Sequence, residues 1–107
     1  MPDQRTRISR QFIEAIPHAR ALGMRLDAVG AGVAQLSMGY DERFIGDPLT
    51  RVIHGGAVFA LMDTCCGTAV MNHPTGAAGT ATIDLRIDYM RPAAPGQRIR
   101  ARAECYH

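Results

Sequence analysis

The stretch VIHGGAVFALMDTCCGTAV, residues 52–70, is the least polar window of the chain and limits its possible folds most strongly. From Gly55 to about Met71 the apolar residues are too many for a single stripe, so the pattern predicts a helix that is apolar on nearly every side. Such a helix has to be covered by other elements. Asp63 lies in the middle of the window. Because a buried carboxylate is costly unless it is paired, hydrogen-bonded or protonated, Asp63 is either satisfied by the structure or used in chemistry.

Length and composition indicate one soluble globular domain. The chain has 107 residues, 47% of them hydrophobic and 21% charged, which suits a single domain over residues 1–107 with one modest core. The net charge is only +2, and the arginines are spread from Arg5 to Arg102, so we expect no nucleic-acid partner. No apolar run is long enough to cross a bilayer, and the N-terminal residues lack the apolar region of a signal peptide. We therefore expect no membrane contact and a cytosolic location.

The cysteines and histidines fit neither a disulfide framework nor a metal site. Cys65 and Cys66 are adjacent and could join only through a strained bridge, and Cys105 has no obvious partner. No Cys-x-x-Cys or His-x-x-x-His spacing occurs. We expect small buried thiols, and neither a metal nor a redox cofactor.

The N-terminal half shows helix, hairpin and loop patterns in turn. Residues 6–18 predict a short amphipathic helix, with Ser9 as a possible cap and Pro17 at its end. Residues 24–38 alternate in polarity around a glycine turn and predict a hairpin. Residues 41–53 combine Gly, Asp and Pro and predict a loop that leads into the apolar helix.

Two strands are predicted after the helix. Residues 81–89 alternate without a break between apolar and polar side chains, which is typical of a strand with one face on a core and one in water. Residues 99–105 repeat the alternation, with Ile99, Ala101, Ala103 and Cys105 facing inward. The fold class is therefore α+β. A curved antiparallel sheet wrapped around one long central helix, the hot-dog fold, would bury both the sheet and the helix.

Three motifs resemble one family within this fold. HGG followed by Asp at 54–63, FIGDP upstream and TIDLRIDYMRPAAPG downstream are similar to the hot-dog acyl-CoA thioesterases of the phenylacetyl-CoA-pathway type, including those related to 4-hydroxybenzoyl-CoA thioesterase. The resemblance extends from about Leu22 to the last residue. In two respects the chain departs from the family pattern. Asp47 occupies a loop position where the family usually has Asn, and such domains normally continue for roughly 30 residues, or two further strands, so we expect a truncated C-terminal edge.

Thioester hydrolysis requires donors where negative charge develops on the carbonyl oxygen, and a base or nucleophile. The first turn of a helix supplies unpartnered N–H groups and a partial positive charge. Gly55 and Gly56, which lack Cβ, allow a thioester to approach, and His54 can orient its carbonyl. The resemblance implies the same roles, with the Gly55 N–H as the oxyanion donor and Asp63 as general base or nucleophile. Alternatively, the glycines serve close packing, His54 is satisfied by the loop, and Asp63 is bonded to Thr64, Thr68 or the backbone.

Other residues are candidates for binding the substrate. The resemblance implies that Thr82 positions water or the carboxylate, although it could equally be a solvated strand residue. Arg91 could meet the phosphates of CoA, although a solvated arginine is the commoner case in such a turn. The acyl pocket is predicted to be lined by Phe59, Met62 and Met90.

Helix geometry predicts an oligomer without reference to any family. Gly55 and Asp63 are eight residues apart, which separates them by roughly 12 Å along one helix, too far to act on one thioester group. The base must then come from an antiparallel second copy, so we expect a homodimer, and a homotetramer if dimers pair.

The sequence thus predicts an acyl-CoA thioesterase that releases a free acid and CoA, with CoA as part of the substrate rather than a cofactor. The alternative is a non-catalytic hot-dog domain that binds acyl-CoA or an acyl carrier protein. Such a domain would use the helix N-terminus but would need no base. The acyl group itself is left open.

Overall fold

The structure of the protein, a computed structural model, describes residues 4–72 and 96–105. The predicted strand over 81–89 and the candidate residues Thr82, Met90 and Arg91 lie outside these ranges. The elements in chain order are α1 (Gln4–Ala15), α2 (Pro17–Ala21), β1 (Met24–Gly30), β2 (Val33–Met38), the 3-10 turn η1 (Glu42–Phe44), β3 (Ile45–Asp47), β4 (Val52–Ile53), α3 (Gly55–Met71) and β5 (Ile99–Glu104).

Within the described residues, β2 is the central strand of a three-stranded antiparallel sheet in the order β1-β2-β5. β1 and β2 form the predicted hairpin, and Gly32 in its turn has a φ of 69°, which a residue with a side chain rarely adopts. β5 pairs with the other edge of β2, with Val33 opposite Glu104 and Met38 opposite Ile99. Residues on β5 alternate between half-buried and exposed, as the sequence predicts.

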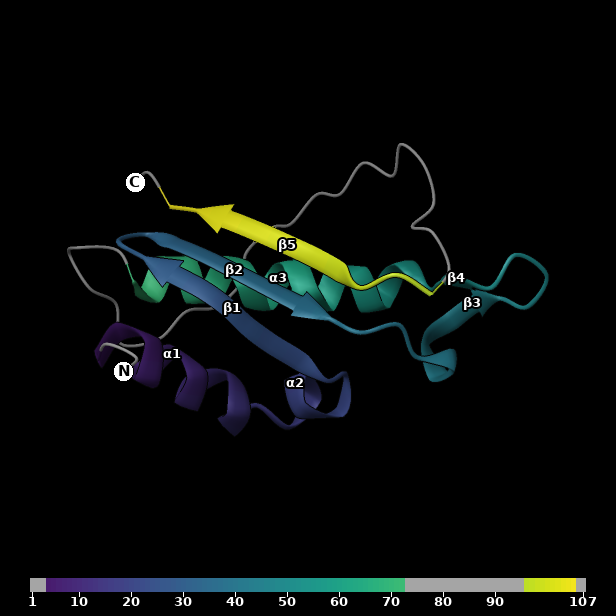
Figure 1. The fold of residues 1–107 in the computed structure, drawn as a ribbon, viewed down its shortest axis with the longest axis horizontal. Helices are drawn as coiled ribbons and strands as arrows, with labels where there is room; N and C mark the ends of the chain where they lie inside the picture. Colours follow the sequence, from purple (N-terminus) through teal and green to yellow (C-terminus); the bar gives the residue numbers. More distant parts are fainter. Residues whose placement is uncertain (1–3, 73–95, 106–107) are drawn as a thin grey trace.

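Helix α3 crosses one face of this sheet and packs against β2 and β5 (Figure 1). Its bounds match the predicted helix. Four residues on the sheet side are fully or almost fully buried: Leu61, Cys65, Thr68 and Ala69. The prediction of burial on nearly every side is wrong for the described part of the chain, where Phe59 is 40% exposed. Among the described residues, the strands that contact the helix lie on one side of it, and the opposite side is half-buried.

The N-terminal segment forms two helices rather than the single predicted helix over 6–18. α1 ends at Ala15, Ile16 is extended with a ψ of 111°, and Pro17 begins α2. Proline disfavours a helical residue before it, yet it suits the first position of a new helix, so Pro17 both ends α1 and begins α2. Ser9 is not a cap. It is buried within α1, where its hydroxyl accepts a hydrogen bond of 2.9 Å from Asn72 at the end of α3.

The predicted loop over 41–53 contains a 3-10 turn and a two-stranded hairpin, β3-β4. The Asp47 carboxylate accepts a hydrogen bond of 3.0 Å from the Leu49 N–H, and the Arg51 N–H donates to the Asp47 carbonyl at 2.7 Å. These bonds close the turn between the strands and leave Arg51 with a φ of 62°. Gly, Asp and Pro marked the turn correctly, but the strands on either side are too short for a periodic signal.

Candidate functional site

The first turn of α3 is organised by His54. Its imidazole Nδ1 accepts a hydrogen bond of 2.8 Å from the Gly56 N–H, so His54 is the N-cap of the helix. A Cβ on Gly56 would lie 3.0 Å from this Nδ1, so the absence of a side chain allows the ring to reach the backbone. Since Nδ1 is the acceptor, Nε2 carries the proton when the ring is neutral.

The FIGDP motif holds His54 in place. The Phe44 carbonyl accepts a hydrogen bond of 2.7 Å from the His54 N–H. A Cβ on Gly46 would lie 2.9 Å from the His54 Cα, a distance that real Cβ atoms do not reach, so only glycine fits where β3 crosses this residue. Asp47 follows, and its carboxylate bonds the Leu49 N–H of the turn rather than facing the start of α3. The motif therefore fixes the backbone that enters the helix.

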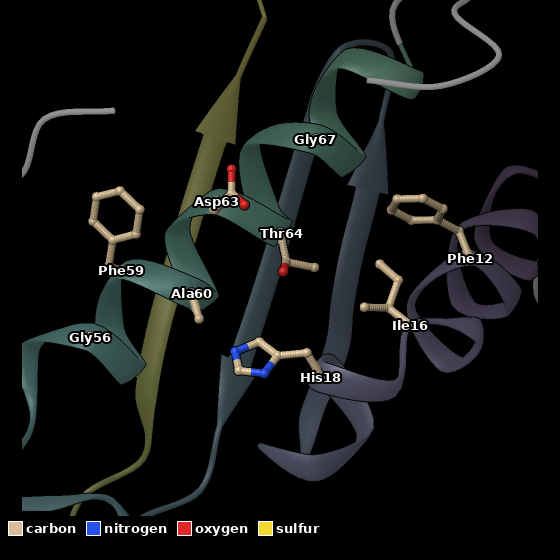
Figure 2. Close-up of a pocket in the computed structure, with 9 residues that line it drawn as sticks. All are labelled: Phe12, Ile16, His18, Gly56, Phe59, Ala60, Asp63, Thr64 and Gly67. Atoms are coloured by element: carbon tan, nitrogen blue, oxygen red, sulfur yellow. The ribbon is translucent and has the colours of Figure 1, made fainter. Parts of the chain in front are cut away.

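An open groove of about 560 Å³ runs along the half-buried side of α3 (Figure 2). Its floor is a stripe of mainly small residues on the helix, and its other wall comes from the N-terminal segment. The lining residues are Phe12, Ile16, His18, Gly56, Phe59, Ala60, Asp63, Thr64 and Gly67. Residues spaced by three or four lie on one helix face, so the stripe is continuous from the first turn of α3 to Gly67.

Asp63 is on this groove and half-buried. Burial, together with the nearby charge of Asp63, raises the pKa of the neighbouring Cys66 thiol. Thr68, one of the residues considered as a hydrogen-bond partner of Asp63, donates its hydroxyl to the Thr64 carbonyl at 2.8 Å instead. Thr68 is also fully buried on the sheet side of the helix. The groove thus combines an apolar wall with a carboxylate beside it.

The N-terminal segment supplies part of the site that sequence reasoning did not identify. Phe12 and Ile16 form an apolar wall, and the His18 imidazole extends from α2 towards α3 beside Ala60 (Figure 2). Phe12 and Ile16 share the helical spacing of a buried face, which is indistinguishable from ordinary core packing. His18 directly follows Pro17 in the sequence. Its position on the groove could not be predicted, because it depends on the second helix, which the sequence pattern did not reveal.

The structure unites some predicted site residues and separates others. Gly56, Phe59 and Asp63 line one groove, whereas Met62 is half-buried outside its lining. Gly55 begins α3 beside the cap. Because α3 is one uninterrupted helix of 17 residues, the axial separation of Gly55 and Asp63 is roughly the 12 Å that ideal geometry gives.

Within the described ranges, no three His, Cys, Asp or Glu side chains gather where a metal ion could be held. None of the helices there is both long and apolar enough to cross a membrane. The Cys65 thiol is buried and donates to the Ala34 carbonyl of β2 at 3.3 Å, which makes it part of the packing between helix and sheet.

The described residues thus place a helix N-terminus, a carboxylate and a groove on one helix that packs on an antiparallel sheet. Residues 51–107 match the family model of the thioesterase superfamily. The medium/long-chain acyl-CoA thioesterase YigI of Escherichia coli is 30% identical over 107 residues, covering 88% of this chain and 68% of YigI. The chain therefore belongs to the thioesterase superfamily.

Two solved structures show the same fold. A Pseudomonas aeruginosa protein of known crystal structure is 37% identical, with a TM-score of 0.82 over 96% of this chain and 76% of its own. The phenylacetic acid degradation protein PaaI from Thermus thermophilus is 29% identical, with a TM-score of 0.69 over 81% of this chain and 70% of its own. The chain has the hot-dog fold of thioesterases.

Proposed function

We propose that this thioesterase hydrolyses acyl-CoA thioesters, with the acyl group in the groove along α3. The observation that carries the proposal is the position of Asp63, on the wall of a groove whose floor begins at Gly56 in the first helical turn. The Gly55 N–H is the oxyanion donor and Asp63 the general base or nucleophile. The activity of the relative YigI on acyl-CoA, as its name states it, supports this substrate class.

His54 has a positioning role in this proposal. Its Nδ1 is bonded to the Gly56 N–H and its backbone N–H to Phe44, so the ring has a fixed orientation at the start of α3. The proton on Nε2 then points away from the cap and can orient the thioester carbonyl. The cap requires an unprotonated Nδ1, because only then can this nitrogen accept the Gly56 N–H.

The length of the groove supports a medium or longer acyl chain. The stripe from Gly56 to Gly67 covers twelve residues of helix, and the eleven steps between its ends correspond to roughly 16 Å. Phe12, Ile16 and Phe59 give it apolar walls. Extended chains of medium length fit such a floor, in agreement with the chain length in the name of YigI.

The test is a hydrolysis assay over acyl-CoA esters with saturated chains of increasing length, together with phenylacetyl-CoA and 4-hydroxybenzoyl-CoA. Release of free thiol is measured for the parent and for Asp63→Asn. We expect hydrolysis of at least one ester by the parent and its loss in the variant. If the parent binds these esters without releasing thiol, the chain is a binding domain and the proposal is wrong.

We further propose that the site is shared between two chains of a homodimer, which can pair into a tetramer. An axial separation of roughly 12 Å prevents Gly55 and Asp63 of one helix from acting on the same thioester group. An antiparallel second helix would bring the partner's carboxylate to the oxyanion donor, and two-fold symmetry makes two such sites.

Mixed dimers test the shared site. Gly55→Pro removes the donor, and His54, with a ψ of 136°, already has the conformation that a following proline requires. Gly55→Pro and Asp63→Asn homodimers should both be nearly inactive. In a random mixture about half of the dimers are mixed, each with one intact site, so activity should return to about a quarter of the parent value. No recovery, with mixed dimers verified by a tag on one chain, would contradict the shared site.

A cytosolic setting is part of the same proposal. It is supported by the reduced thiols of Cys65 and Cys66, which suit a reducing compartment.

A further inference from the structure

A second hollow, of about 270 Å³, is lined by three arginines that are far apart in the sequence. Arg20 comes from α2, Arg43 from η1, and Arg98 from the residues just before β5. Asp41 is the only carboxylate among the lining residues. Three guanidinium groups and one carboxylate give the lining of this arginine hollow a net charge of about +2. Asp27, outside the lining, interacts electrostatically with Arg98 and so offsets part of that charge.

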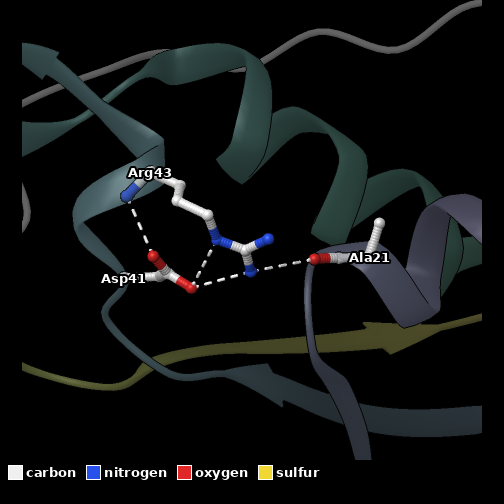
Figure 3. Close-up of polar contacts among 3 residues, drawn as sticks. All are labelled: Ala21, Asp41 and Arg43. Carbon is white, nitrogen blue, oxygen red and sulfur yellow. Dashed lines mark hydrogen bonds and ion pairs between the residues drawn. The ribbon is translucent and has the colours of Figure 1, made fainter.

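Arg43 is fixed in this hollow by several bonds (Figure 3). Its Nε and Nη2 donate to the Asp41 carboxylate at 3.0 and 2.8 Å, and Nη2 also reaches the Ala21 carbonyl at the end of α2. The hydrogen bonds from Arg43 hold the pKa of Asp41 below its usual value. The guanidinium is therefore positioned in advance and stays charged, which lowers the cost of ordering it on a ligand.

Arg98 is also held in a defined position. Its Nε donates to the buried Ser37 hydroxyl at 2.7 Å. A Cβ on Gly39 would lie 3.3 Å from Arg98 Nη1, a tight contact, so glycine leaves room for the guanidinium over the backbone. Two arginines are thus oriented by the protein, while Arg20 is exposed on the adjoining helix.

Arg20 and Arg43 of the arginine hollow come from α2 and η1, and Arg98 directly precedes β5. These elements lie towards the end of the molecule at which α3 begins (Figure 1). Arg43 directly precedes Phe44, whose carbonyl accepts the His54 N–H at 2.7 Å. The short helix α2 contributes to both sites, with His18 on the groove and Arg20 on the hollow. The hollow is therefore adjacent to the start of α3, where the thioester carbonyl is proposed to sit.

We propose that the arginine hollow binds the phosphate groups at the nucleotide end of CoA, an inference that rests on the proposed function. Guanidinium groups pair with phosphate oxygens through charged and often bidentate hydrogen bonds. The pantetheine arm between a thioester and these phosphates is about as long as four extended residues, or ~14 Å. An arm of that length connects the start of α3 with a neighbouring surface site. Arg20, Arg43 and Arg98 then determine the preference for CoA over shorter thioesters.

The experiment compares one acyl group on three thiols: CoA, 3′-dephospho-CoA and N-acetylcysteamine. Arg20→Gln and Arg98→Gln should each reduce the ratio of kcat/KM for acyl-CoA to that for the acyl-N-acetylcysteamine ester by about tenfold, the scale of one charged hydrogen bond. Most of the loss should appear in KM. If the 3′-phosphate is the group bound, the parent enzyme should show a similar loss with dephospho-CoA. If the diphosphate is bound, the parent should have the same kcat/KM for both CoA esters, and only the arginine variants should show a lower kcat/KM for them.

Arg102→Gln is the matched control, because Arg102 is an exposed arginine of β5 that contacts Glu104 at 3.5 Å and does not line the hollow. An equal fall of the ratio in this control would indicate general charge steering and overturn the proposal, as would an unchanged ratio in both hollow variants. Arg98→Lys replaces Arg98→Gln if the latter does not fold. Should the parent hydrolyse none of the three esters, the proposed function fails. Calorimetric titration with CoA, weaker in Arg20→Gln than in Arg102→Gln, still decides whether the hollow binds its phosphates.

Discussion

The two sides of α3 have nearly the same hydropathy but different surroundings. On the sheet side Leu61, Cys65 and Ala69 are at most 1% exposed and pack on β2 and β5. On the groove side Ala60, Asp63 and Thr64 are half-buried beneath α1 and α2. The first side holds the helix to the sheet, and the second leaves space for a ligand.

This difference shows that the site is formed by residue size as well as by polarity. Gly56, Ala60 and Gly67 are small, so the N-terminal segment cannot close completely onto α3 and a groove remains. On the other side Leu61 belongs to the same buried core as Leu36 and Met38 of β2. Substitutions on the sheet side should therefore affect stability, and substitutions on the groove side should affect catalysis.

The largest expected effect is on the sheet side. Leu61→Ala leaves a cavity at a fully buried position and should lower the free energy of unfolding by about 2–5 kcal/mol. Thr64→Ala, one turn along on the groove side, should cost less than about 1 kcal/mol. Urea unfolding of both variants measures the difference, and equal losses would contradict the division of the helix into two sides.

On the groove side, a substitution should change activity rather than stability. Asp63→Asn keeps the shape of the side chain, so the unfolding free energy should change little, while kcat should fall about a hundredfold or more if Asp63 is the base. Glu14→Gln, which removes an exposed carboxylate from α1, is the control and should hydrolyse like the parent. Parent-like rates in Asp63→Asn would assign this residue a structural role.

Cys65, on the sheet side of α3, should make the stability of the protein depend on pH. Burial raises the pKa of the Cys65 thiol from 9.0 to about 11. Between these values the unfolded chain releases a proton that the folded protein retains, so the free energy of unfolding should fall as pH rises, by about 1.4 kcal/mol per pH unit. Denaturant unfolding at a series of pH values from about 8 to 11, which includes both pKa values, measures how the free energy of unfolding changes with pH. Cys65→Ala should remove most of this dependence, and an unchanged slope would show that other groups cause it.

The smallest expected change in stability concerns His54, the N-cap of α3. His54→Ala should cost about 1 kcal/mol of stability, the usual loss for a helix N-cap. His54→Asn supplies another capping acceptor and should restore stability without restoring hydrolysis, because it lacks the Nε2 donor. Thermal melts and thiol release separate the two roles. Full activity in His54→Asn would mean that only the cap matters.

Much of the fold followed from local pattern. The bounds of α3, the hairpin of β1 and β2, and the alternation on β5 were predictable because each depends on residues close together in sequence. The HGG motif and Asp63 led to the prediction of a site on this helix, and that site stays a prediction. The second helix after Pro17 and the β3-β4 hairpin were missed, since each is too short to show a period.

The sequence by itself determined that one apolar helix with an acidic residue needs a sheet to cover it, because hydrophobic burial depends on how much apolar surface a segment carries. Only the tertiary structure decided which side of that helix meets the sheet, which side Phe12, Ile16 and His18 cover, and that Arg20, Arg43 and Arg98 line one hollow. Hydrophobic attraction has no direction, so the choice of neighbours depends on shape and on contacts between residues far apart in the chain.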